Sequence, residues 1–145
     1  MTDDDGSAAL EFITVGLILL IPLVYLVLAL GVIQQQTLGV EAAARHIART
    51  VAGAPDAVTG ERRAERALAA IVETYDLDED AVEVEFTCAP AGTDCPVAGS
   101  IVVVTVSTVA RLPFVPPVLG LDSAAAIPIE ASGAQKVSRR WGGGG

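Results

Sequence analysis

The sequence has few of the side chains that metal sites and catalytic sites use. It contains one histidine, His46, and two cysteines, Cys88 and Cys95. A closed structural zinc site needs four ligands, so this inventory argues against one. The chain also lacks a P-loop, a GxGxxG element and a recognisable set of serine, histidine and aspartate. We therefore expect neither a bound cofactor nor an enzyme, and a hydrolase would need an Asp and Glu pair that converges in a pocket.

Positive charge is scarce and comes late in the chain. There are 9 Lys and Arg against 18 Asp and Glu, which gives a net charge of −9, and the first basic residue is Arg45. The basic residues are interspersed with acidic ones, so no cationic stripe forms that could displace the counterions of a phosphate backbone. We expect no nucleic-acid partner.

Charge of either sign is missing from residues 12–33. As a helix this stretch would be about 33 Å long, at roughly 1.5 Å per residue, which matches the hydrocarbon core of a bilayer. The sequence therefore predicts a transmembrane helix. Pro22 has no N–H, so the carbonyl of Ile18 loses its usual partner, and we expect a kink or a loose turn there.

The alternative for this stretch is a cleaved secretory signal peptide, with residues 29–31 as a small-x-small cleavage site. A signal peptide has a basic region before a shorter apolar run. Here the preceding residues, "MTDDDG", are acidic, and the apolar run is too long. The pattern favours an anchor that stays in the membrane.

The rest of the chain predicts one small α+β domain. The helical pattern continues past the apolar run until "AGAPDAVTG", residues 52–60, and a second amphipathic helix is expected at residues 61–75. From there the period changes to two, which predicts strands of a three- to four-stranded antiparallel sheet. The expected strands are residues 82–88, 100–110 and 124–137, with a proline-rich loop at 111–121 and Pro128 indicating an edge strand or a bulge.

Two features disagree about which side of the membrane holds this domain. The positive-inside rule counts Arg45 and Arg49 after the apolar run and would place the domain in the cytoplasm. Cys88 and Cys95, however, flank "APAGTD", a turn suited to a local disulfide in an oxidising compartment.

The stretch "GSAALEF", residues 6–12, resembles the start of pilin-like proteins of the type IV system. It looks most like the TadE-like pseudopilins of tight-adherence (Flp-type) pili. The resemblance implies that a prepilin peptidase cuts between Gly6 and Ser7, and that Glu11, then the fifth residue, serves assembly. It also implies a pilin-like fold, an extracytoplasmic domain, and as partners the membrane, other pilins or pseudopilins, and a pilus assembly platform with its ATPase.

Together these inferences divide the chain into a leader peptide (1–6), a transmembrane helix (7–33), an extracytoplasmic pilin-like domain (34–137) and a disordered tail (138–145). The expected function is that of a minor pilin or pseudopilin. The alternative is a permanently anchored extracytoplasmic interaction module that never polymerises. It arises because "DDD" precedes Gly6, where prepilins usually carry Lys or Arg. Glu11 has an alternative too, since it could lie at the interface and reach headgroup water.

A calcium site is the last possibility in the sequence. Asp76, Asp78 and Asp80 follow the D-x-D-x-D rhythm that opens a calcium loop. The sixth position is Ala81 instead of Gly, and the twelfth is Thr87 instead of Glu. We expect a solvated acidic loop and no metal.

Overall fold

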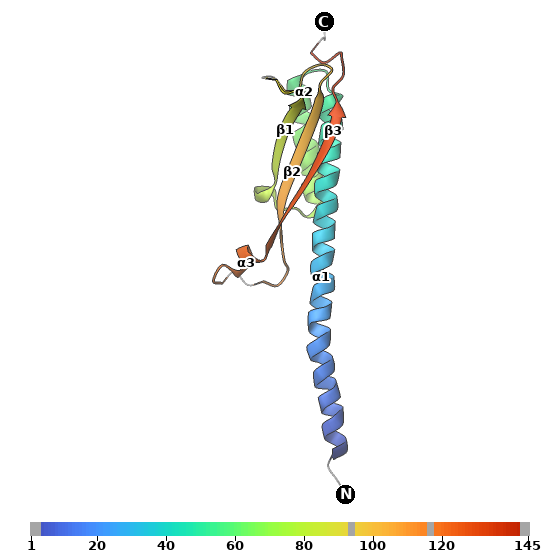
Figure 1. Cartoon of the computed structure of the whole chain (residues 1–145), viewed down its shortest axis with the longest axis vertical. Coiled ribbons are helices and arrows are strands. Elements are labelled where there is room, and N and C mark those ends of the chain that lie inside the picture. Colours follow the sequence, from blue (N-terminus) through green and yellow to red (C-terminus); the bar gives the residue numbers. More distant parts are fainter. Residues whose placement is uncertain (1–3, 93–94, 116–117, 143–145) are drawn as a thin grey trace.

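One long helix and a small domain packed on its second half make up the structure (Figure 1). The structure is a computed structural model that describes residues 4–92, 95–115 and 118–142; the side chains of residues 4–7 and 122 lie outside that description. Helix α1 (Asp4–Ala52) is followed by helix α2 (Ala57–Tyr75) and a three-stranded antiparallel sheet. The predicted α+β fold with a long amino-terminal helix is confirmed.

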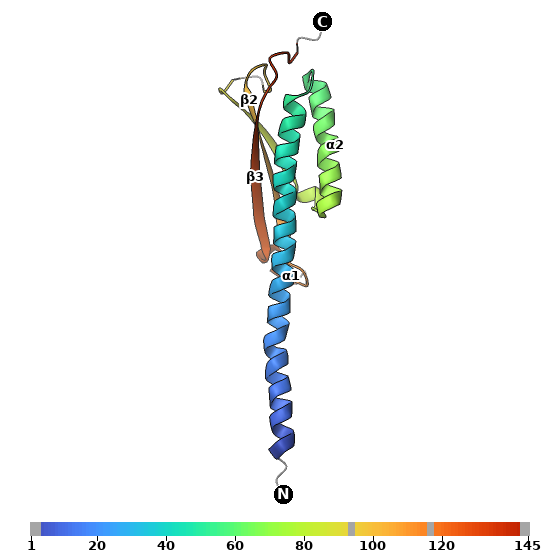
Figure 2. The same cartoon turned by 90° about the vertical axis from the view of Figure 1, so that its right-hand side faces the viewer.

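The amino-terminal half of α1 extends away from the domain (Figures 1 and 2). Its large apolar side chains are exposed, from Leu10 at 69% to Leu30 at 47%. The core helix of a water-soluble protein would bury such side chains. α1 is long and apolar enough to cross a bilayer, and the helix continues without a break through Pro22.

The second half of α1 is amphipathic, and its buried face holds the domain together. Buried residues recur three or four positions apart, which places them along one side of the helix. Most are small, so other elements can approach the α1 backbone closely. They are Val40, Ala43, Ala44, Ile47, Ala48, Val51 and Ala52.

α2 begins four residues earlier than predicted, at Ala57 instead of Glu61. The reason is a cap: the Asp56 side chain accepts a 2.8 Å hydrogen bond from the backbone N–H of Thr59. This hydrogen bond holds the pKa of the Asp56 carboxyl below its usual range. α2 then lies along α1, where Tyr75 packs over Gly39.

The sheet has the order β1-β2-β3, with β1 (Glu83–Ala89), β2 (Ile101–Arg111) and β3 (Ala126–Lys136) all antiparallel. All three predicted strands are present, with ends that differ by one or two residues. β2 is central, as its β-branched sequence predicts. Pro128 lies in β3, opposite Val109. β3 is an edge strand that pairs with β2 on one side only, so the missing N–H of Pro128 does not interrupt a second ladder.

One face of the sheet packs on α1. On β2 the side chains of this face are fully buried and alternate with partly exposed ones. On β3 the closest approach is at Gly133, where an added Cβ would lie 2.6 Å from the Ala44 carbonyl oxygen. Glycine is therefore required sterically at this position. The buried residues of β2 are Val102, Val104, Val106, Thr108 and Ala110.

Three segments differ from the sequence predictions or add to them. A 3-10 turn, η1 (Glu79–Ala81), precedes β1, and a short helix, α3 (Leu121–Ala124), interrupts the loop before β3. The tail was expected to be disordered from residue 138. As far as Gly142 this is corrected, because Trp141 packs against the core and the Gly142 N–H donates to the Pro55 carbonyl at 2.9 Å. Residues 143–145 lie outside the described part.

Gly133→Ala is expected to lower the free energy of unfolding by about 1 to 3 kcal/mol, since the new methyl group would overlap the α1 backbone. Gly92→Ala is the matched control, because an added Cβ there meets nothing within 4 Å. Urea unfolding of the full chain in detergent micelles measures both. Equal midpoints for the two variants would contradict the close contact between β3 and α1.

Candidate functional site

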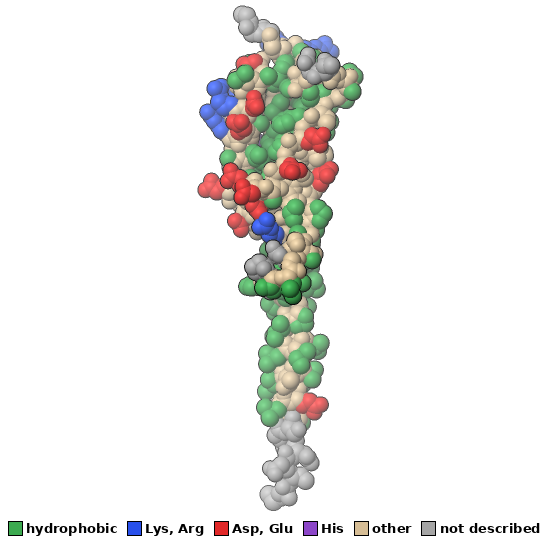
Figure 3. All heavy atoms as spheres, turned by 90° about the vertical axis from the view of Figure 1, so that its left-hand side faces the viewer, with side chains coloured by type: hydrophobic (Ala, Val, Ile, Leu, Met, Phe, Trp, Pro, Cys, Tyr) green, Lys and Arg blue, Asp and Glu red, His purple; other side chains and the backbone are tan. Residues whose placement is uncertain are grey.

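The first candidate site is the exposed amino-terminal part of α1 with Glu11. Glu11 is the one charged residue between Ala8 and Gln36, and its side chain is exposed. Its neighbours Leu10 and Phe12 are 69% and 81% exposed. In Figure 3 this part of the helix is apolar or tan, except for acidic atoms beside the grey amino-terminal residues.

Glu11 has no ion-pair partner among the side chains that the structure describes. Thr14, three residues after Glu11, donates its hydroxyl to the Leu10 carbonyl at 2.8 Å. The helix thus offers an apolar surface for other helices, and one carboxylate that can accept a cation or a hydrogen bond from outside the described residues.

The other predicted residues of this region lie on the same helix. Gly6 and Ser7 fall within the bounds of α1, with side chains outside the description, and residues 1–3 of the predicted leader are not described at all. Pro22 lies in the middle of the apolar run. Cleavage between Gly6 and Ser7, the assembly role of Glu11 and the kink at Pro22 stay predictions.

The second candidate feature is the Cys88–Cys95 disulfide, which is confirmed. The two sulfurs are bonded and the Cα atoms are 5.7 Å apart. The bond ties the end of β1 to the β1–β2 connection. A disulfide forms and persists in oxidising compartments, so it is compatible with an extracytoplasmic domain.

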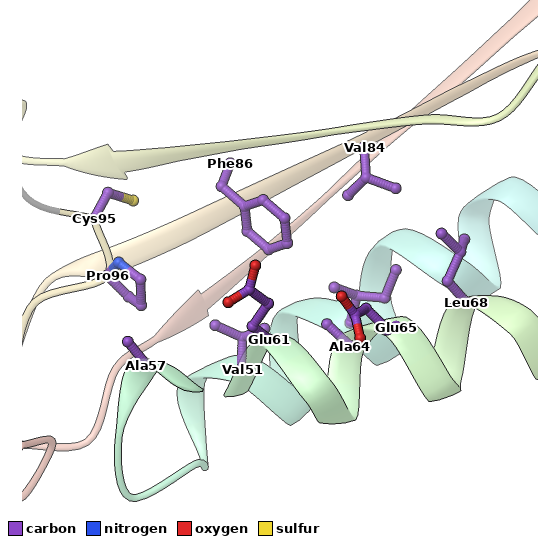
Figure 4. A pocket seen from close by; sticks show the side chains of 11 residues that line it. Val51, Ala57, Glu61, Ala64, Glu65, Leu68, Val84, Phe86, Cys95 and Pro96 are labelled. Carbon is purple, nitrogen blue, oxygen red and sulfur yellow. The ribbon is translucent and has the colours of Figure 1, made fainter. Parts of the chain in front are cut away.

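The third feature is an open groove of about 390 Å³ between α2 and β1. Figure 4 shows Val84 and Phe86 of β1 on one wall and α2 on the other, with the Glu61 carboxylate directed from α2 toward the Phe86 ring. Apolar side chains make up most of the lining, and Phe86 is 40% exposed. Sequence reasoning missed this groove, because its two walls are separated in the chain.

The groove brings two carboxylates together but no further catalytic group. Glu61 and Glu65 are both exposed to solvent. A carboxylic acid that acts as a general acid needs a desolvated environment. No serine or histidine lines the groove, and Cys95 is in the disulfide. This arrangement suits binding of an apolar side chain better than acid and base chemistry.

The acidic segment after α2 is used within the fold. Asp76 caps the carboxyl end of α2, and Asp78 forms a 3.1 Å ion pair with Arg111. The Asp78 side chain also accepts from the Asp80 N–H. In the described ranges, no three His, Cys, Asp or Glu side chains gather closely enough to hold a metal ion. His46 is exposed on α1.

No protein-family model, curated protein or solved structure matches the chain.

Replacing both cysteines, Cys88→Ala with Cys95→Ala, is expected to lower the free energy of unfolding by about 2 to 3 kcal/mol, because the unfolded chain regains the entropy that the closed loop removed. Urea unfolding of the full chain measures this, and reduced wild-type protein should match the double variant. If reduction leaves the wild-type midpoint unchanged, the bond does not stabilise the fold.

Proposed function

We propose that the protein is a minor pilin or pseudopilin of a tight-adherence, type IV-like pilus. α1 anchors it in the membrane, the domain lies outside the cytoplasm, and the chain takes part in pilus assembly. One observation carries the proposal. The exposed apolar part of α1 has a single charged side chain, Glu11, near its amino end, and the same helix leads directly into a small α+β domain.

Cleavage of the leader would supply a positive charge that can pair with the Glu11 carboxylate. Cleavage between Gly6 and Ser7 removes three aspartates, Asp3 to Asp5, and creates an ammonium on Ser7. In an assembly of apolar helices, an ammonium from one subunit neutralises Glu11 of its neighbour. Two unit charges about 4 Å apart attract by about 4 kcal/mol at an effective dielectric constant of about 20, which offsets part of the cost of burying the carboxylate.

The pairing also sets the geometry of assembly. Apolar helices can slide along one another, because every position offers similar packing. One ammonium and one carboxylate per chain fix the axial stagger at which neighbours stop, since any other stagger leaves both charges unpaired in a low-dielectric surrounding. This is the role proposed for Glu11.

The second candidate is a permanently anchored extracytoplasmic interaction module. Two observations favour it: the aspartates that precede Gly6, and the apolar groove between α2 and β1. In this case α1 is only an anchor, Glu11 reaches headgroup water, and the groove carries the function.

The mature amino terminus distinguishes the two candidates. We expect protein extracted from its native membrane to begin at Ser7, because the ammonium that pairs with Glu11 is created by cleavage before Ser7. Intact-mass and amino-terminal peptide spectrometry measure this. An intact "MTDDDG" segment in the mature protein would favour the anchored module and reject processing.

Glu11→Ala is expected to leave membrane insertion intact and to lower the amount of the protein found in sheared pili at least several-fold, because the Ser7 ammonium of the neighbour loses its partner. Glu41→Ala is the matched control. Glu41 is also an acidic residue on α1, but it pairs with Arg45 at 2.8 Å on an exposed surface, where an ion pair contributes little.

Quantitative immunoblots of the membrane and pilus fractions give both amounts. Glu11→Asp should restore part of the pilus signal, since it keeps the charge at a shorter reach. Pilus levels of Glu11→Ala equal to those of Glu41→Ala would reject the assembly role of Glu11.

A further inference from the structure

The connection between β2 and β3 exposes large apolar side chains that the fold does not use. Phe114 is 84% exposed, Leu119 is 99%, Val118 is 52% and Leu121 is 47%. We call these four residues the apolar loop; residues 116–117 between them are not part of it. Isolated exposed apolar residues are common on soluble proteins, but a gathering of large ones marks an interaction surface.

The position of the apolar loop is distinctive. Figures 1 and 2 show that the β2–β3 connection with α3 extends beyond the end of the sheet, toward the level of the amino-terminal half of α1, and Figure 1 shows it to one side of the helix. In Figure 3, apolar side chains gather at this lower edge of the domain. The loop therefore lies near the level at which the domain stops covering α1.

That level coincides with the end of the apolar run. Ile33 is the last residue of the apolar run, because the polar residues Gln34 to Gln36 follow it, and it is partly buried against the domain core. Leu30, one turn earlier, is 47% exposed. If α1 spans the bilayer with residues 12–33 in its hydrocarbon core, the bilayer surface lies at the height of the loop.

We propose that the apolar loop is a second membrane contact, which inserts into the outer surface of the same bilayer that α1 crosses. The exposed apolar side chains of α1 and those of the loop then face the same bilayer. The inference rests on the membrane span of the proposed function, but not on leader cleavage or on entry into pili.

The sheet holds the loop in place for this contact. The ladder between β2 and β3 is paired from Ile101 with Lys136 to Arg111 with Ala126, so both ends of the loop leave a fully paired hairpin. β2 and β3 in turn pack on α1. The orientation of the loop relative to the membrane is thus fixed through α1, which is one continuous helix.

The charges around the loop indicate which lipid chemistry it contacts. Arg111, at the base of the loop, is paired with Asp78, and Glu79 and Asp80 of η1 are exposed. η1 contacts β2. This acidic surrounding would repel anionic headgroups. The contact is therefore with the acyl-chain region, driven by burial of apolar area, and it does not require anionic lipid.

A fluorescent probe on single introduced cysteines tests the proposal in the full chain. Both native cysteines are in the disulfide, so Leu119→Cys and Phe114→Cys can each be labelled selectively. The chain is placed at one copy per phosphatidylcholine nanodisc, and quenching is measured with a nitroxide on the lipid acyl chains and with aqueous iodide. Two variants calibrate the response: Leu20→Cys within the span, 52% exposed, and Val58→Cys at the start of α2, 70% exposed.

We expect lipid nitroxide to quench the Leu119 and Phe114 probes several-fold more than the Val58 probe, and iodide to quench them less. Replacing part of the lipid with an anionic one should not increase the lipid quenching. If the loop probes behave like Val58 while Leu20 is quenched by lipid, the membrane contact is wrong and the span stands.

Two other outcomes also overturn the proposal. Loop probes shielded from both quenchers would show that protein covers the loop, as a second copy of the chain would. A Leu20 probe that lipid does not quench would reject the span, and with it the proposed function as well as this inference.

Discussion

The structure depends on one continuous helix whose two halves need different surroundings. The first half of α1 carries apolar side chains around its circumference and leaves them exposed, while the second half buries a single face under the domain. Water cannot stabilise the first half, because a helix that is apolar on all sides needs lipid or other apolar helices around it. The change between the two regimes falls between Ala29, which is 6% exposed, and Ile33, where the apolar run ends and packing against the domain core begins.

The domain is built to fit the second half of this helix. Its small residues let β3 approach until Gly133 meets the backbone at Ala44, and Tyr75 of α2 closes over Gly39. Because the core is centred on α1 and not on the sheet alone, the domain cannot turn independently of α1. Whatever orientation the amino-terminal half of α1 takes is passed to the whole domain.

Much of this fold could be predicted from local sequence patterns. The period of two gave all three strands, and the period of 3.6 gave both long helices, since side-chain alternation reports directly which face is buried. The errors occur where nonlocal contacts decide. Trp141 docks over Gly60, and nothing near "SRRW" indicates this, while the groove needs Phe86 and α2 to come together. The start of α2 was missed although its signal, Asp56 as an N-cap, was present in the sequence.

Glu11 could be identified as a candidate site from the sequence alone, because no basic residue lies near it in the chain. No Lys or Arg precedes Arg45, and on one continuous helix Arg45 lies about 50 Å from Glu11 at roughly 1.5 Å per residue. The basic residues of α1 itself, Arg45 and Arg49, therefore cannot reach Glu11. Side chains on a helix tilt toward its amino end, so the Glu11 carboxylate is directed toward the end where cleavage would create an ammonium. The compensating charge that we propose for Glu11 is an amino-terminal ammonium, presented by a neighbouring helix at a fixed stagger.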